Sequence, residues 1–259
     1  MDFQVSNLER RNAILVLLEE KKRVSVPFLC QKFSISEATA RRDLEYLASA
    51  GKIRRVRGGA IALAISSPEL PVFQRGDEHA REKDQIGRAA ARWITDGETI
   101  FLGSGTTVHA IARHLPEFTH LTILTNSLPI INSLVGRAGI NLIILGGFLR
   151  ESELSFIGHI AEKALSEVRA DKVFISARAV SLDYGVTNDF MAETATDRAI
   201  LKIGRQTILV VDHSKFNRIS TAFLAPLQNF DLLITDRGIN PDDVRSLEKQ
   251  GLRLELAPG

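Results

Sequence analysis

Hydrophobic residues in the first fifty positions recur at helical spacing, in three short segments separated by turn residues. The pattern predicts helices over residues 8–20 and 25–33, the second with Pro27 in its first turn, where proline is tolerated. A third helix is expected to begin at Ser36 and to stop at Gly51. All three segments have one apolar and one polar side, as helices on the surface of a small core do.

A basic strand over residues 52–57 and a Gly58-Gly59 turn follow the third predicted helix. Three short helices and a hairpin within about sixty residues are typical of a winged helix-turn-helix. We therefore expect a domain of this type over residues 1–61.

Beyond residue 76 the pattern changes to short apolar runs that alternate with helical segments, the first of them over residues 77–95. The apolar runs cover residues 99–102, 121–125, 142–145, 172–176, 207–211, 231–235 and 252–256. Continuous apolar strands separated by helices predict a mainly parallel sheet covered on both faces. We expect an α/β domain over residues 77–259, joined to the first domain by a linker with two prolines over residues 62–76.

Composition limits the class of protein. A chain of 259 residues is long enough for two domains, and 44% hydrophobic with 25% charged residues is ordinary for a soluble protein. The apolar runs are far shorter than the roughly 20 residues that cross a bilayer. The single cysteine, Cys30, cannot form an internal disulfide. We therefore expect a cytoplasmic protein without a membrane span.

The net charge of +2 conceals an asymmetry between the two predicted domains. Residues 1–60 carry a formal charge of +5 and the remaining residues carry −3. A small basic domain before a mildly acidic one favours nucleic-acid binding by the first.

The third predicted helix carries side chains that suit DNA. Thr39 and Arg42 share one face, while Ala40, Leu44 and Leu47 mark the opposite, buried face. Such a helix can enter a major groove and contact phosphates and base edges together. The candidate DNA-binding residues are Ser36, Thr39, Arg41, Arg42, Arg54, Arg55 and Arg57. RNA binding or an architectural role remains an alternative, which the compact helix-turn-helix pattern favours less than duplex DNA.

Glycines and polar residues follow the predicted strands, at the carboxyl ends where open α/β sheets bind ligands. Residues 103–107 lead from the first strand into a helix expected over 108–114, whose N–H groups can bind phosphate. The candidate ligand-binding residues are Gly103, Ser104, Gly105, Thr106, Thr107, Asn126, Ser127, Gly146, Gly147, Arg150, Arg178 and Lys215. Around one crevice these groups suit a small phosphorylated sugar or polyol.

Other chemistries find less support. The glycine-rich segment lacks the Gly-Lys-Ser/Thr ending of a nucleotide P-loop. Asp212, His213 and Ser214 are adjacent in the chain and cannot form a hydrolase triad. Apart from His109 and His114, the histidines show no two-ligand spacing. We expect no catalytic residue, no metal site and no cofactor.

Motifs along nearly the whole chain resemble the DeoR/GlpR family of bacterial transcription regulators. In the first domain they are S-I-S-E-A-T-A-R-R-D-L-E-Y-L and R-V-R-G-G-A. In the second they are I-T-D-G-E-T-I-F-L-G-S-G-T-T, L-T-I-L-T-N-S, L-G-G-F-L-R, D-K-V-F-I-S-A, D-H-S-K-F and A-P-L followed by D-L-L-I-T-D. The resemblance implies a sensor domain similar to ribose-5-phosphate isomerase folds, sugar-phosphate binding, and oligomeric repressors of catabolic operons.

Carried over by position, the resemblance implies DNA contacts from Thr39, Arg41 and Arg42. It also implies an effector site lined by Gly105, Thr106, Thr107, Asn126, Ser127, Gly146, Gly147 and Lys215. A homo-oligomer is expected independently, because one short recognition helix reads few base pairs and operators usually repeat with the symmetry of the protein.

Two segments depart from the family pattern. Gly103 stands where many relatives carry an acid, and Arg178 falls in a segment that tends to read G-A-x-G-I in relatives. Both changes make the crevice more positive, so we expect Arg178 to help bind the effector. The alternative is that Arg178 pairs with an acid such as Asp183 or Glu193.

The sequence therefore predicts a repressor of a carbohydrate-catabolic operon that binds duplex operator DNA and a phosphorylated sugar or polyol. The competing hypothesis is an active sugar-phosphate isomerase, which needs a carboxylate base beside the substrate carbon. Isomerases of the similar fold carry a D-G-A-D-E-like acidic cluster that this sequence lacks. Asp183, Asp189 and Glu193 lie near the fourth strand but are expected to be unclustered.

Overall fold

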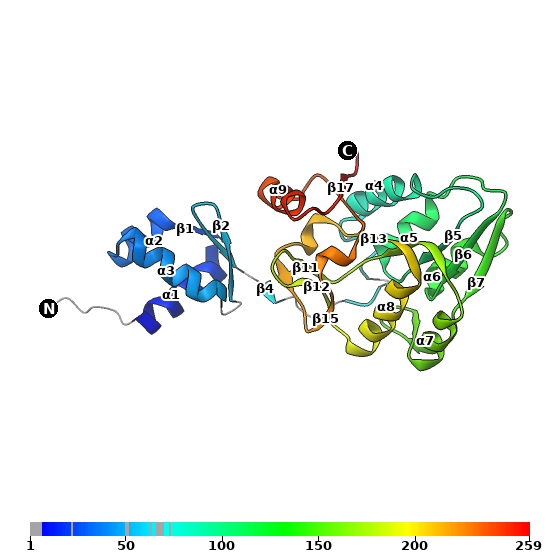
Figure 1. Cartoon of the computed structure of the whole chain (residues 1–259), viewed down its shortest axis with the longest axis horizontal. Coiled ribbons are helices and arrows are strands. Elements are labelled where there is room, and N and C mark those ends of the chain that lie inside the picture. The colour runs from blue at the N-terminus through cyan, green and yellow to red at the C-terminus, as the bar shows by residue number, and fades with distance from the viewer. Residues whose placement is uncertain (1–6, 22, 50–51, 63, 66–69, 73) are drawn as a thin grey trace. The chain divides into compact units, whose positions relative to one another are not determined.

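The structure, a computed structural model, describes residues 7–21, 23–49, 52–62, 64–65, 70–72 and 74–259 (Figure 1). By its internal contacts the chain divides into two compact units. The first, here called the head, comprises residues 1–65 with 217–219, and the second, the body, comprises the rest. Gly51 and parts of the predicted linker (63, 66–69 and 73) lie outside the described residues.

The head has the predicted winged helix-turn-helix fold. Its helices are α1 (Asn7–Lys21), α2 (Val26–Phe33) and α3 (Glu37–Ser49). Strands β1 (Arg23–Ser25), β2 (Ile53–Val56) and β3 (Gly59–Ala62) form an antiparallel sheet in the order β1-β3-β2. The sequence analysis did not predict β1, because three residues between two helices show no readable alternation. A further short strand of this unit, β4 (Ala64–Ile65), pairs in parallel with β14 (Arg218–Ile219).

The core of the head forms where the three helices meet the sheet. Leu18, Leu29, Leu44 and Ile53 are almost completely buried there. Gly59 lets two strands approach closely, because a Cβ at this position would lie 2.0 Å from the carbonyl oxygen of Val24. The sheet therefore depends on the absence of a side chain at Gly59.

The body is built on one seven-stranded parallel sheet in the order β17-β16-β13-β10-β5-β6-β7. Its strands are β5 (Thr99–Leu102), β6 (Leu121–Thr125), β7 (Ile140–Ile144), β10 (Ala170–Ile175), β13 (Gly204–Val210), β16 (Leu232–Thr235) and β17 (Leu254–Leu256). Each corresponds to one predicted apolar run, so the parallel α/β architecture is confirmed. Along the chain, β5, β6 and β7 extend the sheet in one direction. The chain then returns to β10 on the other side of β5, and β13, β16 and β17 extend the sheet in the opposite direction. The strand order therefore reverses between the neighbours β5 and β10.

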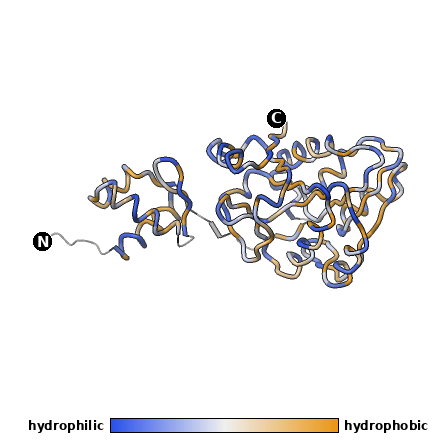
Figure 2. Tube along the Cα trace, in the orientation of Figure 1, coloured by the Kyte–Doolittle hydropathy of each residue, from blue (hydrophilic) through white to orange (hydrophobic). Residues whose placement is uncertain are grey.

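Among the described residues, three helices cover each face of this sheet. One layer contains α4 (Ala80–Ala91), α5 (Thr106–Arg113) and α6 (Leu128–Leu134), and the other contains α7 (His159–Ser166), α8 (Met191–Ile203) and α9 (Pro241–Lys249). Strand β5 faces both layers: Ile100 and Leu102 pack with α4–α6, and Phe101 packs with α7 and α8. Figure 2 shows hydrophobic and hydrophilic residues alternating along the helices, as expected for elements with one buried side.

The boundaries predicted for two helices of the body are wrong. The helix expected over 77–95 is α4, which starts at Ala80 because His79 has a left-handed backbone (φ 50°). It ends at Ala91. The hydrogen bonds that follow span three residues instead of four, as from Trp93 N–H to the carbonyl of Ala90 at 3.0 Å. The helix expected from Val108 begins at Thr106, directly after Gly105.

Short strands that the sequence did not predict lie on the carboxyl side of the sheet. Strands β8 (Phe148–Arg150) and β9 (Ser155–Ile157) form a hairpin. Strands β11 (Ala179–Ser181), β12 (Gly185–Asn188) and β15 (Ala222–Ala225) form a small antiparallel sheet. Short 3-10 helices span His213–Lys215 (η1) and Leu227–Asn229 (η2). In the part of the chain that the structure describes, no helix is long and apolar enough to cross a membrane.

Candidate functional site

The exposed face of α3 begins with a capped N-terminus. The hydroxyl of Ser36 accepts from the N–H of Thr39 at 3.2 Å and lies 3.0 Å from the Thr39 hydroxyl. Capping of this kind satisfies one of the free N–H groups at a helix start. Ser36 therefore orders the first turn, and it holds the Thr39 side chain beside it.

The candidate arginines of the head differ in exposure. Arg41, Arg42 and Arg57 are exposed, and Arg55 is half-buried, 3.4 Å from Glu45. Arg41 lies 3.0 Å from Glu37, an exposed pair within one helix that DNA phosphates can displace. Arg54 is only 5% exposed, and its guanidinium donates to the Asn217 side chain of the same unit. Arg54 is therefore buried, whereas the other six candidates are exposed or half-buried.

A buried ionic contact fixes the recognition helix to α1. Asp43, on the inner side of α3, accepts from Arg10 Nε at 2.6 Å and from Arg11 Nε at 2.8 Å. Asp43 is 2% exposed, so its carboxylate depends on these donors rather than on water. The contact sets the orientation in which α3 presents Thr39 and its arginines.

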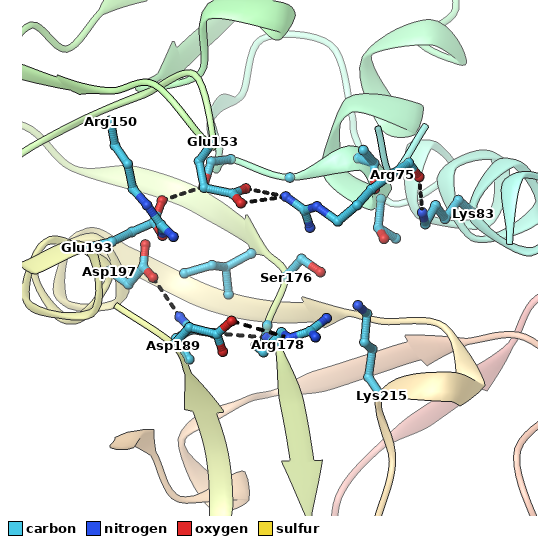
Figure 3. Close-up of a pocket in the computed structure, with 17 residues that line it drawn as sticks. Arg75, Lys83, Arg150, Glu153, Ser176, Arg178, Asp189, Glu193, Asp197 and Lys215 are labelled. Atoms are coloured by element: carbon cyan, nitrogen blue, oxygen red, sulfur yellow. Dashed lines mark hydrogen bonds and ion pairs between the residues drawn. The ribbon is translucent and has the colours of Figure 1, made fainter. Parts of the chain in front are cut away.

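The body has a pocket at the carboxyl ends of β5 and β10, where the strand order reverses (Figure 3). Residues 104–107, after β5, form one wall, and residues 175–178, after β10, form another. The β8–β9 hairpin, the turn from β12 to α8, and Lys215 complete the lining. Open α/β sheets bind ligands at such a reversal of strand order.

One end of the pocket is cationic. Arg75, Lys83 and Lys215 converge there beside the first turn of α5, and Figure 3 shows Lys83 and Lys215 on the same side of the pocket. Gly105 precedes this turn with φ 102°, a backbone conformation that other residues rarely adopt. Burial lowers the pKa of Lys83, Asp212 opposes this shift, and Lys215 and Arg75 lower the pKa further. Clustered positive charges and a helix N-terminus together favour an anion.

The opposite end is rich in carboxylates held by arginines. Arg150 pairs with Glu193, which also accepts from Ser155 Oγ at 2.8 Å. Arg178 Nε lies 3.4 Å from Asp189. Between the two ends, Arg75 lies 2.5 Å from Glu153, and both side chains are buried. The lining residues thus make a network of opposite charges rather than a purely basic site.

Asp197 is the most buried carboxyl of the acidic end. Its carboxylate accepts from Asn188 Nδ2 at 2.8 Å. Burial, reinforced by the neighbouring charge of Glu193, raises the pKa of Asp197 well above its usual range. The pocket has five cationic side chains against Glu153, Asp189, Glu193 and Asp197. A protonated Asp197 increases the excess of positive charge.

Seven of the twelve predicted ligand-binding residues line this pocket: Ser104, Gly105, Thr106, Thr107, Arg150, Arg178 and Lys215. Arg178 faces the pocket and also pairs with an acid, Asp189. The expectation that the nearby acids are unclustered is wrong for Asp189 and Glu193: Asp189 lies between β12 and α8, Glu193 lies in the first turn of α8, and both line the same pocket.

The other five predicted residues do not line the pocket. Gly103 directly follows β5, and its N–H donates to the carbonyl oxygen of Phe174 in β10 at 3.0 Å. Asn126 donates to the carbonyl of Phe156 at 3.1 Å and ties β6 to β9. Ser127 is 1% exposed at the start of α6 and borders a neighbouring hollow that Gly105 and Thr106 share.

Gly146 and Gly147 directly precede β8, the first strand of the β8–β9 hairpin. Gly146 is exposed, and a Cβ there would meet no atom within 4 Å. A Cβ at Gly147, in contrast, would lie 2.7 Å from the carbonyl oxygen of Ile157. Gly147 is therefore needed for a close approach of two strands.

Eight polar or charged lining residues were not among the predicted ligand-binding residues: Arg75, Lys83, Glu153, Ser176, Asn188, Asp189, Glu193 and Asp197. Ser176 directly follows β10, at the same strand end as the predicted Arg178. Glu193 and Asp197 lie four residues apart on α8 and point inward together, which is a readable helical signal. Arg75 and Lys83 precede the first strand of the sheet, where strand ends give no guidance.

Comparison with known proteins identifies both units. Residues 10–65 match the DeoR-like helix-turn-helix domain, and residues 78–237 match the DeoR C terminal sensor domain. The chain belongs to the DeoR family of transcriptional regulators. The glycerol-3-phosphate regulon repressor of Escherichia coli (strain K12) is 34% identical over 248 residues, 96% of this chain and 98% of that protein. The regulator YulB of Bacillus subtilis (strain 168) is 31% identical over 250 residues, 96% of each chain.

A third relative of this DeoR-family regulator is GolR of Listeria innocua, 30% identical over 96% of this chain and 98% of that protein. All three relatives are named as regulators or repressors of transcription, so the isomerase hypothesis is not favoured. Among solved structures, a D-ribose-5-phosphate isomerase in complex with phospho-erythronic acid is similar to this chain. The similarity covers 53% of this chain and 54% of the isomerase chain. The TM-score is 0.40 and the identity is 17%.

Proposed function

We propose that this DeoR-family regulator represses a carbohydrate-catabolic operon in the cytoplasm and is released from its operator by a small phosphorylated sugar or polyol. The observation that carries the proposal is the pocket at the β5–β10 reversal, which combines a cationic end with a polar, carboxylate-bearing end. The relative named as the repressor of a glycerol-3-phosphate regulon supports a link to a phosphorylated polyol.

The head supplies the contacts to duplex DNA. Thr39 and Arg42 share the exposed face at the start of α3 and are placed to reach base edges in a major groove. Arg41 and Arg57 are exposed cations that suit phosphate oxygens, and Arg55 lies beside them on β2. We leave Arg54 out of the contact set because its side chain is buried.

The difference between Arg57 and Arg54 tests this assignment. The affinity of the full chain for duplex operator DNA is measured at several salt concentrations, and log K is plotted against log salt. Arg57→Ala should flatten the slope by about 0.9, the effect of one lost phosphate contact. Arg54→Ala, the matched control on the same hairpin, should leave the slope unchanged. An unchanged slope for Arg57→Ala removes that residue from the contact set.

The pocket fits a ligand with an anionic and a hydroxylated end. Lys83, Lys215 and the first turn of α5 suit a phosphate group. Asp189, Glu193 and Asn188 at the other end are hydrogen-bond acceptors for hydroxyl groups. A ligand that has both kinds of group matches both ends, whereas a free sugar matches one.

A thermal-shift screen of the full chain tests the ligand class. Phosphorylated sugars and polyols are compared with their unphosphorylated forms, since a ligand at 100 times its Kd stabilises the folded state by about 2.7 kcal/mol. We expect shifts only with phosphorylated compounds, smaller shifts in Lys215→Gln, and unchanged shifts in the control Lys202→Gln. A hit must also weaken operator binding. Shifts that are equal with and without the phosphate contradict the proposed ligand class.

We also propose that the regulator acts as a homo-oligomer. One recognition helix reads few base pairs, so two heads on a repeated operator are the simplest arrangement. The edge strand β7 exposes Ile143 and Ile144, and Phe148 is 71% exposed nearby, so the body offers an apolar surface for association. Sedimentation of the full chain as a monomer at micromolar concentration, with and without operator DNA, contradicts this part.

A further inference from the structure

Three potential metal ligands meet in the body outside the functions assigned so far. His79 directly precedes α4, while Asp212 and His213 follow β13. One ligand atom from each lies within 4.8 Å of the other two. The two imidazole rings meet edge-on with centroids 5.1 Å apart. Sequence spacing cannot reveal such a group, because its members come from segments far apart in the chain.

Asp212 is the buried member of this cluster. The residue is completely buried, and its Oδ1 accepts from the N–H of Ser214 at 2.9 Å and from the Ser214 hydroxyl. Its Oδ2 is buried and has no hydrogen-bond partner among the described residues. A buried carboxylate oxygen without a hydrogen-bond partner is costly, and a bound cation removes that cost.

His213 is already oriented as a metal ligand. Its Nδ1 lies 2.8 Å from Oδ2 of Asp236, a buried residue that also accepts from the N–H groups of His213 and Gly238. A Cβ on Gly238 would lie 2.6 Å from His213 Nδ1, so the contact needs glycine there. This arrangement leaves Nε2 of His213 for a ligand. Metal-binding histidines commonly use one nitrogen for the metal and the other for a carboxylate.

We propose that His79, Asp212 and His213 bind a divalent transition-metal ion of the zinc type. Two imidazole nitrogens and one carboxylate oxygen are a set that zinc accepts, with the fourth position left for water. Ligand atoms around tetrahedral zinc lie about 3.3 Å apart at bond lengths of about 2.0–2.1 Å, so the cluster must contract. The exposed His79 side chain provides this movement.

The surrounding charges select the kind of metal. Lys83 and Lys215 line the pocket described above, and their positive charges disfavour a cation held by charge alone. Magnesium and calcium, which prefer several oxygen ligands, are therefore poor candidates. Zinc, cobalt and nickel bind imidazole nitrogen strongly enough to suit this site.

Titration of the full chain with Co²⁺, monitored by its visible absorption, tests the proposal. We expect one ion per chain, displaced by Zn²⁺. The two informative variants are His79→Asn and His213→Asn, because asparagine tolerates the left-handed backbone of residue 79 and can keep the contact from residue 213 to Asp236. Each should weaken Co²⁺ binding at least about tenfold. His159→Asn, an exposed histidine at the start of α7, is the matched control and should bind as the unmodified chain does.

Two outcomes overturn the proposal. One is the absence of a bound ion in the unmodified chain, which does not depend on the folding of any variant. The other is Co²⁺ binding in both variants that is as tight as in the control. Neither outcome bears on the effector proposal, whose readout is operator release by phosphorylated compounds.

Discussion

Asp43 shows how a single buried carboxylate orients the DNA-binding face. It accepts from Arg10 and Arg11 of α1 while being 2% exposed. Asp43→Ala removes the carboxylate that Arg10 and Arg11 share, so we expect the unfolding free energy of the head to fall by about 3–5 kcal/mol. Glu37→Ala is the control, because its exposed pair with Arg41 contributes at most about 0.5 kcal/mol. Urea unfolding followed by far-UV circular dichroism measures both, and equal effects contradict the prediction.

Asp197 predicts a pH dependence of stability. Burial raises the pKa of Asp197 in the folded state above its unfolded value. The protonated carboxyl therefore contributes stability that is fully present at acidic pH and is lost as the pH rises through the folded-state pKa. Asp197→Asn stays neutral at every pH, so its melting temperature relative to the unmodified chain should rise as the pH increases. The exposed Asp183→Asn should show no such trend, and a trend of opposite sign for Asp197→Asn contradicts the assignment.

At the scale of single residues, sequence reasoning found cations better than it found paired acids: three of the five lining cations were predicted as ligand-binding residues, and none of the four lining acids. Thr106 and Lys215 stand directly after predicted strands, so their position in the pocket follows from the fold. Glu153 lies in a hairpin turn that no pattern predicted, and its role depends on Arg75, far away in the chain. The burial of Arg54 could not be predicted either, because consecutive arginines in a strand do not reveal which of their side chains faces the core.

At the scale of elements, the contact between α4 and α5 depends on Gly87. A Cβ at this position would lie 2.6 Å from the carbonyl carbon of Ala110 and 2.8 Å from its Cβ. Alanine gains about 1 kcal/mol of helix propensity over glycine, but the clash is with backbone, which cannot move aside cheaply. We expect Gly87→Ala to destabilise the body by about 1–3 kcal/mol, measured by the urea midpoint of Trp93 fluorescence. Arg88→Ala, on the exposed side of the same helix, should change the midpoint little.

The strands of the main sheet were predictable and the short strands outside it were not. The seven parallel strands were visible because each lies in a continuous apolar run, and the inner strands such as β5 and β16 are buried on both faces. Strands β8 and β12 are short and mix apolar with polar residues, so they show neither a continuous apolar run nor a clear period. They bring Arg150 and Asn188 to the pocket, and Asn188 was not predicted.

At the scale of the whole molecule, the head and the body have separate cores. Leu44 belongs to the core of the head, and the only tryptophan, Trp93, packs in the body. Leu44→Ala should cost the head about 2–5 kcal/mol and shift its part of the circular dichroism transition. The Trp93 fluorescence midpoint should stay where it is. If Leu44→Ala lowers the midpoints of both the circular dichroism transition and the Trp93 fluorescence, the chain unfolds as one cooperative unit.

The strand order also determines when each part becomes complete during synthesis. The head depends mostly on contacts among its first sixty-odd residues, so it can form while the body is still unfinished. The body cannot do the same, because β5 is made first but lies in the middle of its sheet and needs β10, which begins at Ala170. The edge strand β17 comes last, near the end of the chain. A ribosome stalled between these points therefore carries a DNA-binding head that no metabolite can yet control.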